Sequence, residues 1–235
     1  LDYKTIWLGP TGLSDAPAEG TRTINSPQST GMLSGDYMPL HDNPALAQMP
    51  GDQRTEDAGS LCFDSAPLTE PWDTSTVDFT LSSDASNGLL AVRLCDVDEN
   101  GASTLITYGV VNLAQRDGRE VCAEVKPGIP YRIRYDLNDI AHRVVPGHRL
   151  RIAVSNAMFP MAWPVAENHT LTLDLSKCCI HLPDAALDDS DPSRVIFARP
   201  RVAKAARVSE TEPSGNSRII RHDLGTGEKS LTLSA

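Results

Sequence analysis

The sequence contains few aromatic residues, few basic residues and no long apolar run. Aromatic residues make up 5% of the 235 positions, which leaves little material for the exposed aromatic platforms on which sugars stack. The 21 lysines and arginines stand against 31 acidic residues, giving a net charge of −10, whereas binding to phosphates requires a basic patch. No apolar stretch approaches the roughly 18 residues of a membrane-spanning helix. The composition therefore argues against a nucleic-acid partner and a membrane span.

The five cysteines cannot all pair with one another, because their number is odd. Cys62, Cys95 and Cys122 lie in apolar, strand-like runs, where buried free thiols are the usual arrangement. Cys178 and Cys179 are adjacent in the sequence and cannot readily form a bridge with each other. We therefore expect a reducing compartment, and a cytoplasmic location in preference to a secreted one.

Short β-rich runs separated by turn residues dominate the sequence, and helical periodicity is nearly absent. In residues 148–155, Leu150, Ile152 and Val154 alternate with other side chains, and in residues 169–175 leucines alternate with polar residues. This is the period of half-buried antiparallel strands. We expect an all-β protein, a two-sheet β-sandwich or jelly roll with long irregular loops. The predicted strands are 3–8, 60–63, 76–83, 88–97, 104–113, 129–137, 148–155, 169–175 and 194–198.

Three segments depart from this pattern. Residues 9–58 are rich in Gly, Pro, Ser and Asp, and a connection of this length is usually functional or packed against something. Residues 183–193 have the composition of a solvated acidic loop. Near the end of the chain, SRIIRHDLGTGEKSLTLSA follows a basic linker and predicts a β-hairpin with a glycine turn. We expect a jelly-roll domain at residues 1–200, and a linker with a terminal hairpin extension at residues 201–235.

The stretch NDIAHRVVPGHRLRIAVS, residues 138–155, contains the residue types of a hydrolase triad, namely Asp139, His142, His148 and Ser155. The nucleophile of an α/β-hydrolase lies in a G-x-S-x-G turn between a strand and a helix, and the sequence has no such motif. Pro146-Gly147 instead predicts a tight turn that leads into a strand. We therefore expect these residues at the edge of a sheet, and we expect no catalytic residue in this chain.

Two segments partly match metal-binding motifs. DVDENG, residues 96–101, resembles the first half of a calcium loop, but Thr107 stands where the motif requires a bidentate glutamate. The segment is better explained as a hairpin turn between two strands. Cys178, Cys179 and His181 are potential zinc ligands, but no second pair with matching spacing accompanies them. We expect neither a metal site nor a cofactor.

Two apolar stretches lack the periodicity of a strand or a helix. SNAMFPMAWPVAEN, residues 155–168, contains two methionines, a phenylalanine and a tryptophan, and DYMPLHDNPALAQMP, residues 36–50, is a second apolar loop. Such segments bury themselves in the chain's own core, or against a partner or a ligand. The candidate substrate-pocket or interdomain residues are Tyr37, Leu40, His41, Met158, Phe159 and Trp163.

Several segments together resemble the C-terminal domain of X-prolyl dipeptidyl-peptidases and cocaine-esterase-type hydrolases. They are, in order, PGDQRTEDAGSLCFDSAPLTEP, GLLAVRLCDVDENG, YGVVNLAQR and PGHRLRIAVSNAMFP, and the opening YKTIWLGPTGLSD is similar to the first strand of that domain. The likeness covers roughly residues 1–200. It implies a jelly roll resembling galactose-binding domains, joined to an α/β-hydrolase domain that carries the catalytic Ser, Asp and His.

The resemblance implies a non-catalytic domain of a serine hydrolase that acts on esters, amides or X-Pro peptides. Such a domain packs on the α/β-hydrolase domain of the same protein and walls part of its pocket, here with the loops around Tyr37–His41 and Met158–Trp163. Asp52-Gln53-Arg54 and Gly147-His148-Arg149 are expected to be structural, an arginine tying a turn to a strand. Three alternatives remain: an autonomous carbohydrate-binding module, a complete enzyme of unfamiliar type, and a homodimer in which the loop at 155–168 pairs across a two-fold axis.

Overall fold

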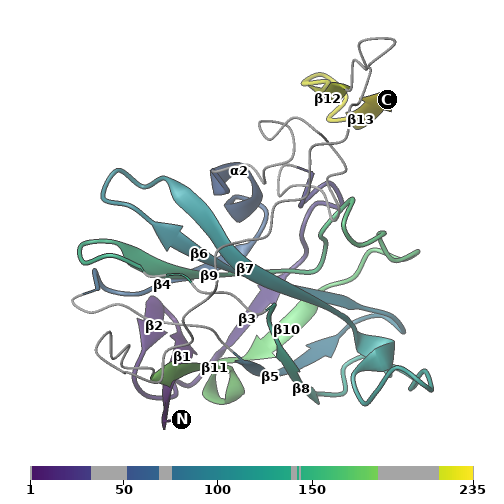
Figure 1. The fold of residues 1–235 in the computed structure, drawn as a ribbon. Helices are drawn as coiled ribbons and strands as arrows, with labels where there is room; N and C mark the ends of the chain where they lie inside the picture. The colour runs from purple at the N-terminus through teal and green to yellow at the C-terminus, as the bar shows by residue number, and fades with distance from the viewer. Residues whose placement is uncertain are drawn as a thin grey trace, which may run out of the picture. The chain divides into compact units, whose positions relative to one another are not determined.

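The computed structural model describes residues 2–32, 52–68, 76–138, 142, 144–184 and 217–234. By its internal contacts the chain divides into two units, residues 1–185 and 186–235. The first unit is an all-β sandwich of a seven-stranded and a four-stranded sheet, and the second contains a two-stranded hairpin (Figure 1). The all-β class expected from the sequence is confirmed.

The seven-stranded sheet is organised around β5 (Thr76–Ser83). One edge of β5 pairs with β8 (Tyr131–Asp136) in antiparallel register. The opposite edge is shared, because β11 (Cys179–Asp184) pairs with the first residues of β5 and β10 (Leu171–Asp174) pairs with the last. The 3-10 turn η2 (Leu175–Lys177) separates these two strands. β10 and β11 therefore lie end to end as one interrupted strand.

The next position in this sheet is also shared by two strands. β1 (Asp2–Gly9) pairs with β11, and β3 (Thr21–Ile24) pairs with β10, so β1 and β3 lie end to end as well. Between them the chain passes through β2 (Gly12–Ser14), which turns back to pair with the end of β1. The sheet thus has the order β2-β1-β11-β5-β10-β3, with β8 attached to β5.

The four-stranded sheet has the order β4-β9-β6-β7. It consists of β4 (Leu61–Asp64), β9 (Arg149–Ser155), β6 (Leu89–Val97) and β7 (Ser103–Asn112), and every pairing is antiparallel. All 9 residues of β6 are buried, so this strand is covered on both faces. A short helix, α2 (Arg54–Asp57), precedes β4 in the chain.

One hydrophobic core fills the space between the two sheets. The alternation predicted from the sequence explains it, since Leu150, Ile152 and Val154 of β9 are all buried and belong to this core. Leu171 and Leu173 of β10 point into it from the other sheet, and both are 0% exposed. Other large side chains in the core are Ile6, Leu8, Phe63, Phe79, Leu81, Leu90, Val92, Leu94, Ile133 and Ile180.

The two sheets contact each other along both lateral edges of the sandwich. At one edge β2 lies against β4, so closely that a Cβ atom on Gly12 would lie 2.5 Å from the carbonyl oxygen of Asp64. Gly12 also has a φ of 146°, which favours glycine. At the other edge β8 approaches β7, and the Asn138 N–H donates to the Tyr108 carbonyl at 3.2 Å. At both places an outer strand of the four-stranded sheet, β4 or β7, contacts a strand of the other sheet.

The second unit contains a hairpin of β12 (Ser217–His222) and β13 (Lys229–Ser234), in which Ile220 is opposite Leu231. The Asp223 carboxylate accepts the N–H groups of two turn residues at 2.8 Å and 2.9 Å, and these bonds hold the pKa of that carboxyl below its usual value. The expected boundary at residue 200 stays a prediction, because residues 185–216 lie outside the described part of the chain.

Eight of the nine predicted strands are present, with ends within two residues of the prediction, and the ninth, 194–198, lies outside the described residues. The structure adds β2, β3, β11 and α2, which the sequence interpretation left as loop. Among the cysteines, Cys95 is buried as expected, and burial raises the pKa of its thiol to about 12. The expected burial of Cys62 and Cys122 is wrong, since both are exposed. Among the described residues, no helix is long and apolar enough to cross a membrane.

Truncation of a core leucine tests the predicted alternation of β10. Leu173→Ala should lower the free energy of unfolding by about 2–5 kcal/mol, because it leaves a cavity between the sheets. Thr172→Ala, in the same strand but facing away from the core, should lower it by less than about 1 kcal/mol. Urea denaturation of both variants checks this, and equal losses would contradict the assignment of faces.

Candidate functional site

An arginine is buried on the outer side of the four-stranded sheet. Leu90, Val92 and Leu94 of β6 face the hydrophobic core, so Arg93 projects from the opposite face of the strand. It is nevertheless only 1% exposed, the largest of the fully buried side chains among the described residues. The groups that bind its guanidinium all come from residues 53–60, the segment that contains α2. This segment therefore packs over Arg93.

The guanidinium of Arg93 is satisfied by an ion pair and two hydrogen bonds. Nη2 lies 2.9 Å from Oδ1 of Asp57 in α2. Nη1 donates to Oε1 of Gln53 at 3.0 Å, and Nη2 donates to Oγ of Ser60 at 3.1 Å. Removing a charge from water costs several kcal/mol unless charged and polar partners replace the water. The charge of Arg93 therefore requires α2 to lie over β6, where Asp57 can pair with the guanidinium.

A second arginine extends this group of charges. Arg151 of β9 donates to Oδ2 of Asp57 at 3.0 Å, and its Nε and Nη2 bind the two oxygens of Asp64 at 2.7 Å each. These carboxylates hold the pKa of Arg151 above its usual value. Two arginines and two aspartates thus alternate across β6, α2, β9 and β4. We call Arg93, Asp57, Arg151 and Asp64 the ion-pair network.

Next to Asp57, a buried carboxylate joins α2 to a distant segment. Glu56 is 3% exposed, and its Oε2 accepts a hydrogen bond from the N–H of Gly31. Residue 30 in turn contacts the loop after β9, because the Phe159 N–H donates to the Thr30 carbonyl at 2.8 Å. A Cβ atom on Gly31, which has a φ of 106°, would lie 2.6 Å from the Phe159 carbonyl oxygen. Three segments, around residues 30, 56 and 159, therefore meet at one place.

The loop of residues 157–168, the Phe159–Trp163 loop, has a fixed base. Asn156, 6% exposed, donates from Nδ2 to the carbonyl of His169 at 2.6 Å, which joins the two ends of the loop. Its Oδ1 accepts the N–H of Ser26 at 2.6 Å. His169 is itself buried, and its Nε2 accepts the N–H of Leu89 at 3.3 Å. The loop therefore starts and ends on groups that are bonded to the sandwich.

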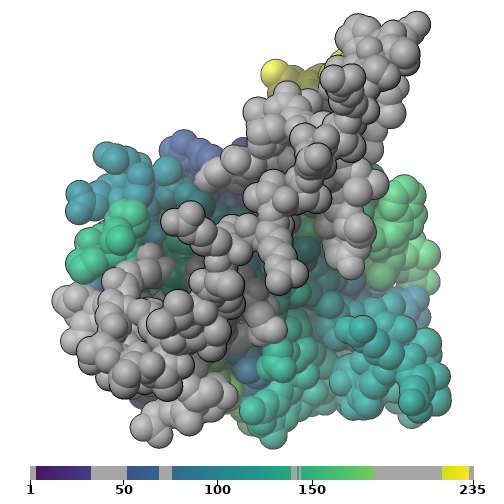
Figure 2. All heavy atoms as spheres, viewed as in Figure 1, coloured from purple at the N-terminus to yellow at the C-terminus, as the bar shows by residue number. Residues whose placement is uncertain are grey.

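The predicted contact residues of this loop have different environments. Met158 is 2% exposed and packs inside the unit, whereas Trp163 is 78% exposed. Phe159 is half-buried and its ring centroid lies 5.3 Å from that of Trp163, with the ring planes at 53°. In Figure 2 the loop forms the green projection on the right of the described surface. The two rings thus present an apolar surface to solvent on a loop that is anchored at its base.

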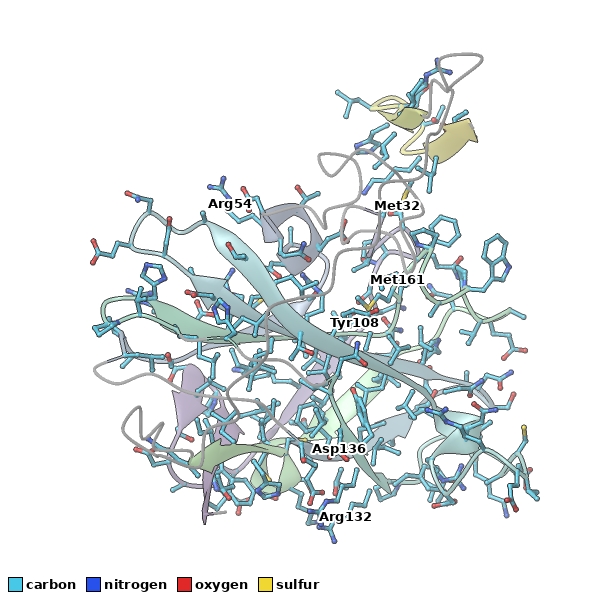
Figure 3. All side chains as sticks on the ribbon, viewed as in Figure 1. Met32, Arg54, Tyr108, Arg132, Asp136 and Met161 are labelled. Atoms are coloured by element: carbon cyan, nitrogen blue, oxygen red, sulfur yellow. The ribbon has the colours of Figure 1, made fainter. Side chains whose placement is uncertain are left out.

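The remaining predicted contact residues, Tyr37, Leu40 and His41, lie outside the described residues. Nearer the start of the chain, Thr30 and Gly31 are described, and both contact Phe159 directly. Figure 3 labels Met32 and Met161, one on each of the two segments that meet here. Residues 30–32 therefore lie beside the Phe159–Trp163 loop, whereas the second apolar stretch, residues 36–50, lies outside the described residues.

Of the triad-type residues around β9, the two histidines share one partner, Asp96, whereas Ser155 has a different one. His142 Nε2 and His148 Nδ1 lie 3.1 Å and 2.7 Å from the two carboxylate oxygens of Asp96. The Ser155 hydroxyl instead donates to the Ala157 carbonyl at 2.9 Å, and Asp139 lies outside the described residues. The two histidines tie the turn before β9 to the end of β6. The sequence interpretation missed Asp96 as their common partner.

The partial metal motifs have structural roles in the described residues. Asp98 of DVDENG caps the β6–β7 turn, since its Oδ1 accepts the N–H groups of Asn100 and Ala102 at 2.8 Å each. His181 Nδ1 lies 3.0 Å from the Thr5 hydroxyl. Burial raises the pKa of the Cys179 thiol to about 11. Across the described ranges, no three His, Cys, Asp or Glu side chains are arranged to hold a metal ion.

The outer face of the seven-stranded sheet carries a separate ion pair. Arg132 of β8 binds both oxygens of Asp78 in β5, at 2.8 Å and 2.5 Å, and this lowers the pKa of the Asp78 carboxyl. The neighbouring Asp136 accepts a hydrogen bond from Thr76 at 2.7 Å. Arg132 and Asp136 are labelled on β8 in Figure 3. This pair belongs to the sheet opposite to the ion-pair network.

Removal of Asp57 tests whether α2 depends on the ion-pair network. Asp57→Ala should reduce the free energy of unfolding by about 3–5 kcal/mol, because it leaves Arg93 buried without its ionic partner. Asp52→Ala is the matched control, since Asp52 pairs with Arg54 at the other end of the same segment, where both side chains are largely exposed. That exposed pair should contribute little to stability. Guanidinium denaturation compares them, and similar losses would refute the role given to the network.

Comparisons with known proteins agree with this fold. The family model of the X-Pro dipeptidyl-peptidase C-terminal non-catalytic domain matches residues 1–196. The cocaine esterase of a Rhodococcus species is 27% identical over 175 residues, which cover 67% of this chain and 30% of that protein. A Mycobacterium bovis protein named as a serine esterase is 31% identical over 126 residues, 45% of this chain and 20% of the relative.

Among solved structures, an α-amino acid ester hydrolase superposes with a TM-score of 0.66 at 20% sequence identity, over 77% of this chain and 36% of that one. The chain therefore spans only between 20% and 36% of the length of these three proteins. The match to the family model covers most of the chain, including both sheets of the sandwich. The resemblance found in the sequence is thereby confirmed, and the chain belongs to the family of X-Pro dipeptidyl-peptidase C-terminal non-catalytic domains.

Proposed function

We propose that this chain is the C-terminal domain of a serine hydrolase that acts on esters, amides or X-Pro peptides. In that protein the domain, a jelly roll of the galactose-binding type, packs on the α/β-hydrolase domain and walls part of its substrate pocket. Membership in a non-catalytic family supports this, as do the names of the relatives, which include a cocaine esterase and an ester hydrolase. The catalytic Ser, Asp and His belong to the α/β-hydrolase domain.

The observation that carries the proposal is the exposure of Trp163. This side chain is 78% exposed and contacts Phe159, on a loop whose base is fixed by buried hydrogen bonds. Burying a large apolar side chain against a partner contributes about 1.5–3 kcal/mol. A fixed loop also loses little conformational entropy when it docks. The loop therefore has the properties of a preformed contact with another domain.

We assign the wall of the substrate pocket to the same region as the Phe159–Trp163 loop. Tyr37, Leu40 and His41 follow the segment that contacts Phe159, so we place them with Phe159 and Trp163 on the face that meets the catalytic domain. Apolar side chains at this face exclude water from the reacting groups, which strengthens electrostatic interactions within a closed pocket. This chain thus contributes binding surface, and the chemistry belongs to its partner.

The second candidate, an autonomous carbohydrate-binding module, rests on the same tryptophan. An exposed indole is a surface on which a sugar ring can stack, and Trp163 with Phe159 is such a surface. A glycan screen against the isolated chain, read by tryptophan fluorescence, separates the two candidates. We expect no binding, and micromolar binding that disappears in Trp163→Ala would favour the sugar module.

A serine-directed probe tests where the nucleophile lies. The isolated chain should not be labelled by a fluorophosphonate, whereas the full-length protein from lysate of the source organism should be labelled and should react with an antibody raised to this chain. Labelling of the isolated chain would show that it carries its own nucleophile. An unlabelled lysate band of this chain's own size would contradict the proposed hydrolase.

Replacement of Trp163 tests the interdomain contact in the full-length hydrolase. Trp163→Ala should lower kcat/KM by about tenfold or more, because misplacement of a pocket wall by about 1 Å can cost up to 100-fold. It should also make the two domains unfold at separate temperatures in calorimetry. Val121→Ala is the control, since Val121 is 77% exposed on a different loop. A Trp163→Ala protein that behaves like Val121→Ala would refute the assigned face.

A further inference from the structure

We propose that Glu56 is a positioning residue, which sets the place of the Phe159–Trp163 loop and of the segment ending at Met32 relative to each other. The inference rests on the proposed function, because the Phe159–Trp163 loop carries two of the residues assigned to the interdomain face. Glu56 belongs to α2, its side chain is buried, and its carboxylate accepts the Gly31 N–H. It acts through the backbone that it holds.

Glu56 stands on a rigid support. Its neighbour in α2, Asp57, is bound by Arg93 at 2.9 Å and by Arg151 at 3.0 Å, two arginines from central strands of the four-stranded sheet. The Asp57 and Ala58 N–H groups donate to the carbonyls of Gln53 and Arg54, which closes the helical turn. The position of the Glu56 carboxylate is therefore defined by the sheet.

From Glu56 the contacts lead directly to the exposed rings. The carboxylate accepts the Gly31 N–H, the Thr30 carbonyl accepts the Phe159 N–H at 2.8 Å, and the Ala162 N–H donates to the Met158 carbonyl at 2.7 Å. The last bond closes the turn that presents Trp163. Gly31 is in close contact with the backbone of Met158 and Phe159, because an added Cβ would approach both within 2.7 Å. A shift of Gly31 therefore moves the loop.

The need to anchor α2 does not explain this buried carboxylate. The ion-pair network already fixes α2 to the sheet through Asp57, on the adjacent position of the same turn. A buried carboxylate carries a desolvation cost that an apolar side chain of similar size would not have. The Glu56 carboxylate accepts a hydrogen bond from Gly31, a glycine with positive φ that precedes Tyr37 in the chain. Its contribution is thus to place a loop accurately.

The test uses the full-length hydrolase and two substitutions of Glu56. Glu56→Ala removes the acceptor for the Gly31 N–H and should lower kcat/KM by about tenfold, mostly through KM, because binding geometry is lost while the catalytic groups are intact. Glu56→Gln keeps a carbonyl oxygen at this place and should remain within about threefold of the parent protein. Both are assayed well below their melting temperatures.

Asp78→Asn is the matched control for general loss of stability. Asp78 is also a buried carboxylate with a charged partner, Arg132, but it lies on the opposite sheet. The control should lower the melting temperature without changing kcat/KM. If Glu56→Ala behaves in the same way, or if Glu56→Gln is as impaired as Glu56→Ala, the inference is wrong.

Gly31→Ala keeps the test decisive if Glu56→Ala does not fold. A methyl group at Gly31 displaces the same backbone from the side of Phe159 with Glu56 intact, and it should give the same rise in KM. An unchanged KM in a folded Gly31→Ala protein would overturn the inference. Trp163→Ala separates failure of the inference from failure of the proposed function. If Trp163→Ala impairs the hydrolase but the Glu56 and Gly31 variants do not, only the inference is wrong. If Trp163→Ala has no effect, the assigned face itself is wrong.

Discussion

A guanidinium group without access to water constrains the whole outer side of the four-stranded sheet. Arg93 projects from a strand whose other residues are equally buried, and its charge must be met by groups that the sheet itself does not supply. Gln53, Asp57 and Ser60 meet it, so the segment before β4 has to cross over β6. This path of the segment over β6 sets the position of α2. It also directs the Glu56 side chain toward Gly31, and so positions residues 28–32.

Much of the sandwich could be predicted from the sequence, because its strands follow simple alternation. Leu150, Ile152 and Val154, and likewise Leu171 and Leu173, mark a buried face with a period of two. β11 shows the same signal at Ile180 and Leu182, but the adjacent cysteines at its start and the proline near its end concealed it. β3 could not be found this way, because TRTI contains a single apolar residue and forms only by pairing with β10.

The candidate site was only half predictable, for a different physical reason. An apolar loop such as FPMAW is visible in a sequence because its composition departs from that of ordinary loops. The polar groups that hold it, Glu56 and Asn156, are ordinary surface residue types, and only their partners Gly31 and His169 reveal their role. One signal was available, since a lone arginine within LLAVRLC requires buried counter-charges nearby.

The meeting of β2 with β4 and of β7 with β8 has a consequence for how such a domain can diversify. A strand edge that lies against the other sheet is less accessible to a further strand, so recognition by backbone pairing is disfavoured at these two places. The connections between strands are better suited to recognition, because their length and chemistry can change while the sheets stay as they are. One scaffold could thus be combined with catalytic domains of differing specificity, each fitted by its own set of loops.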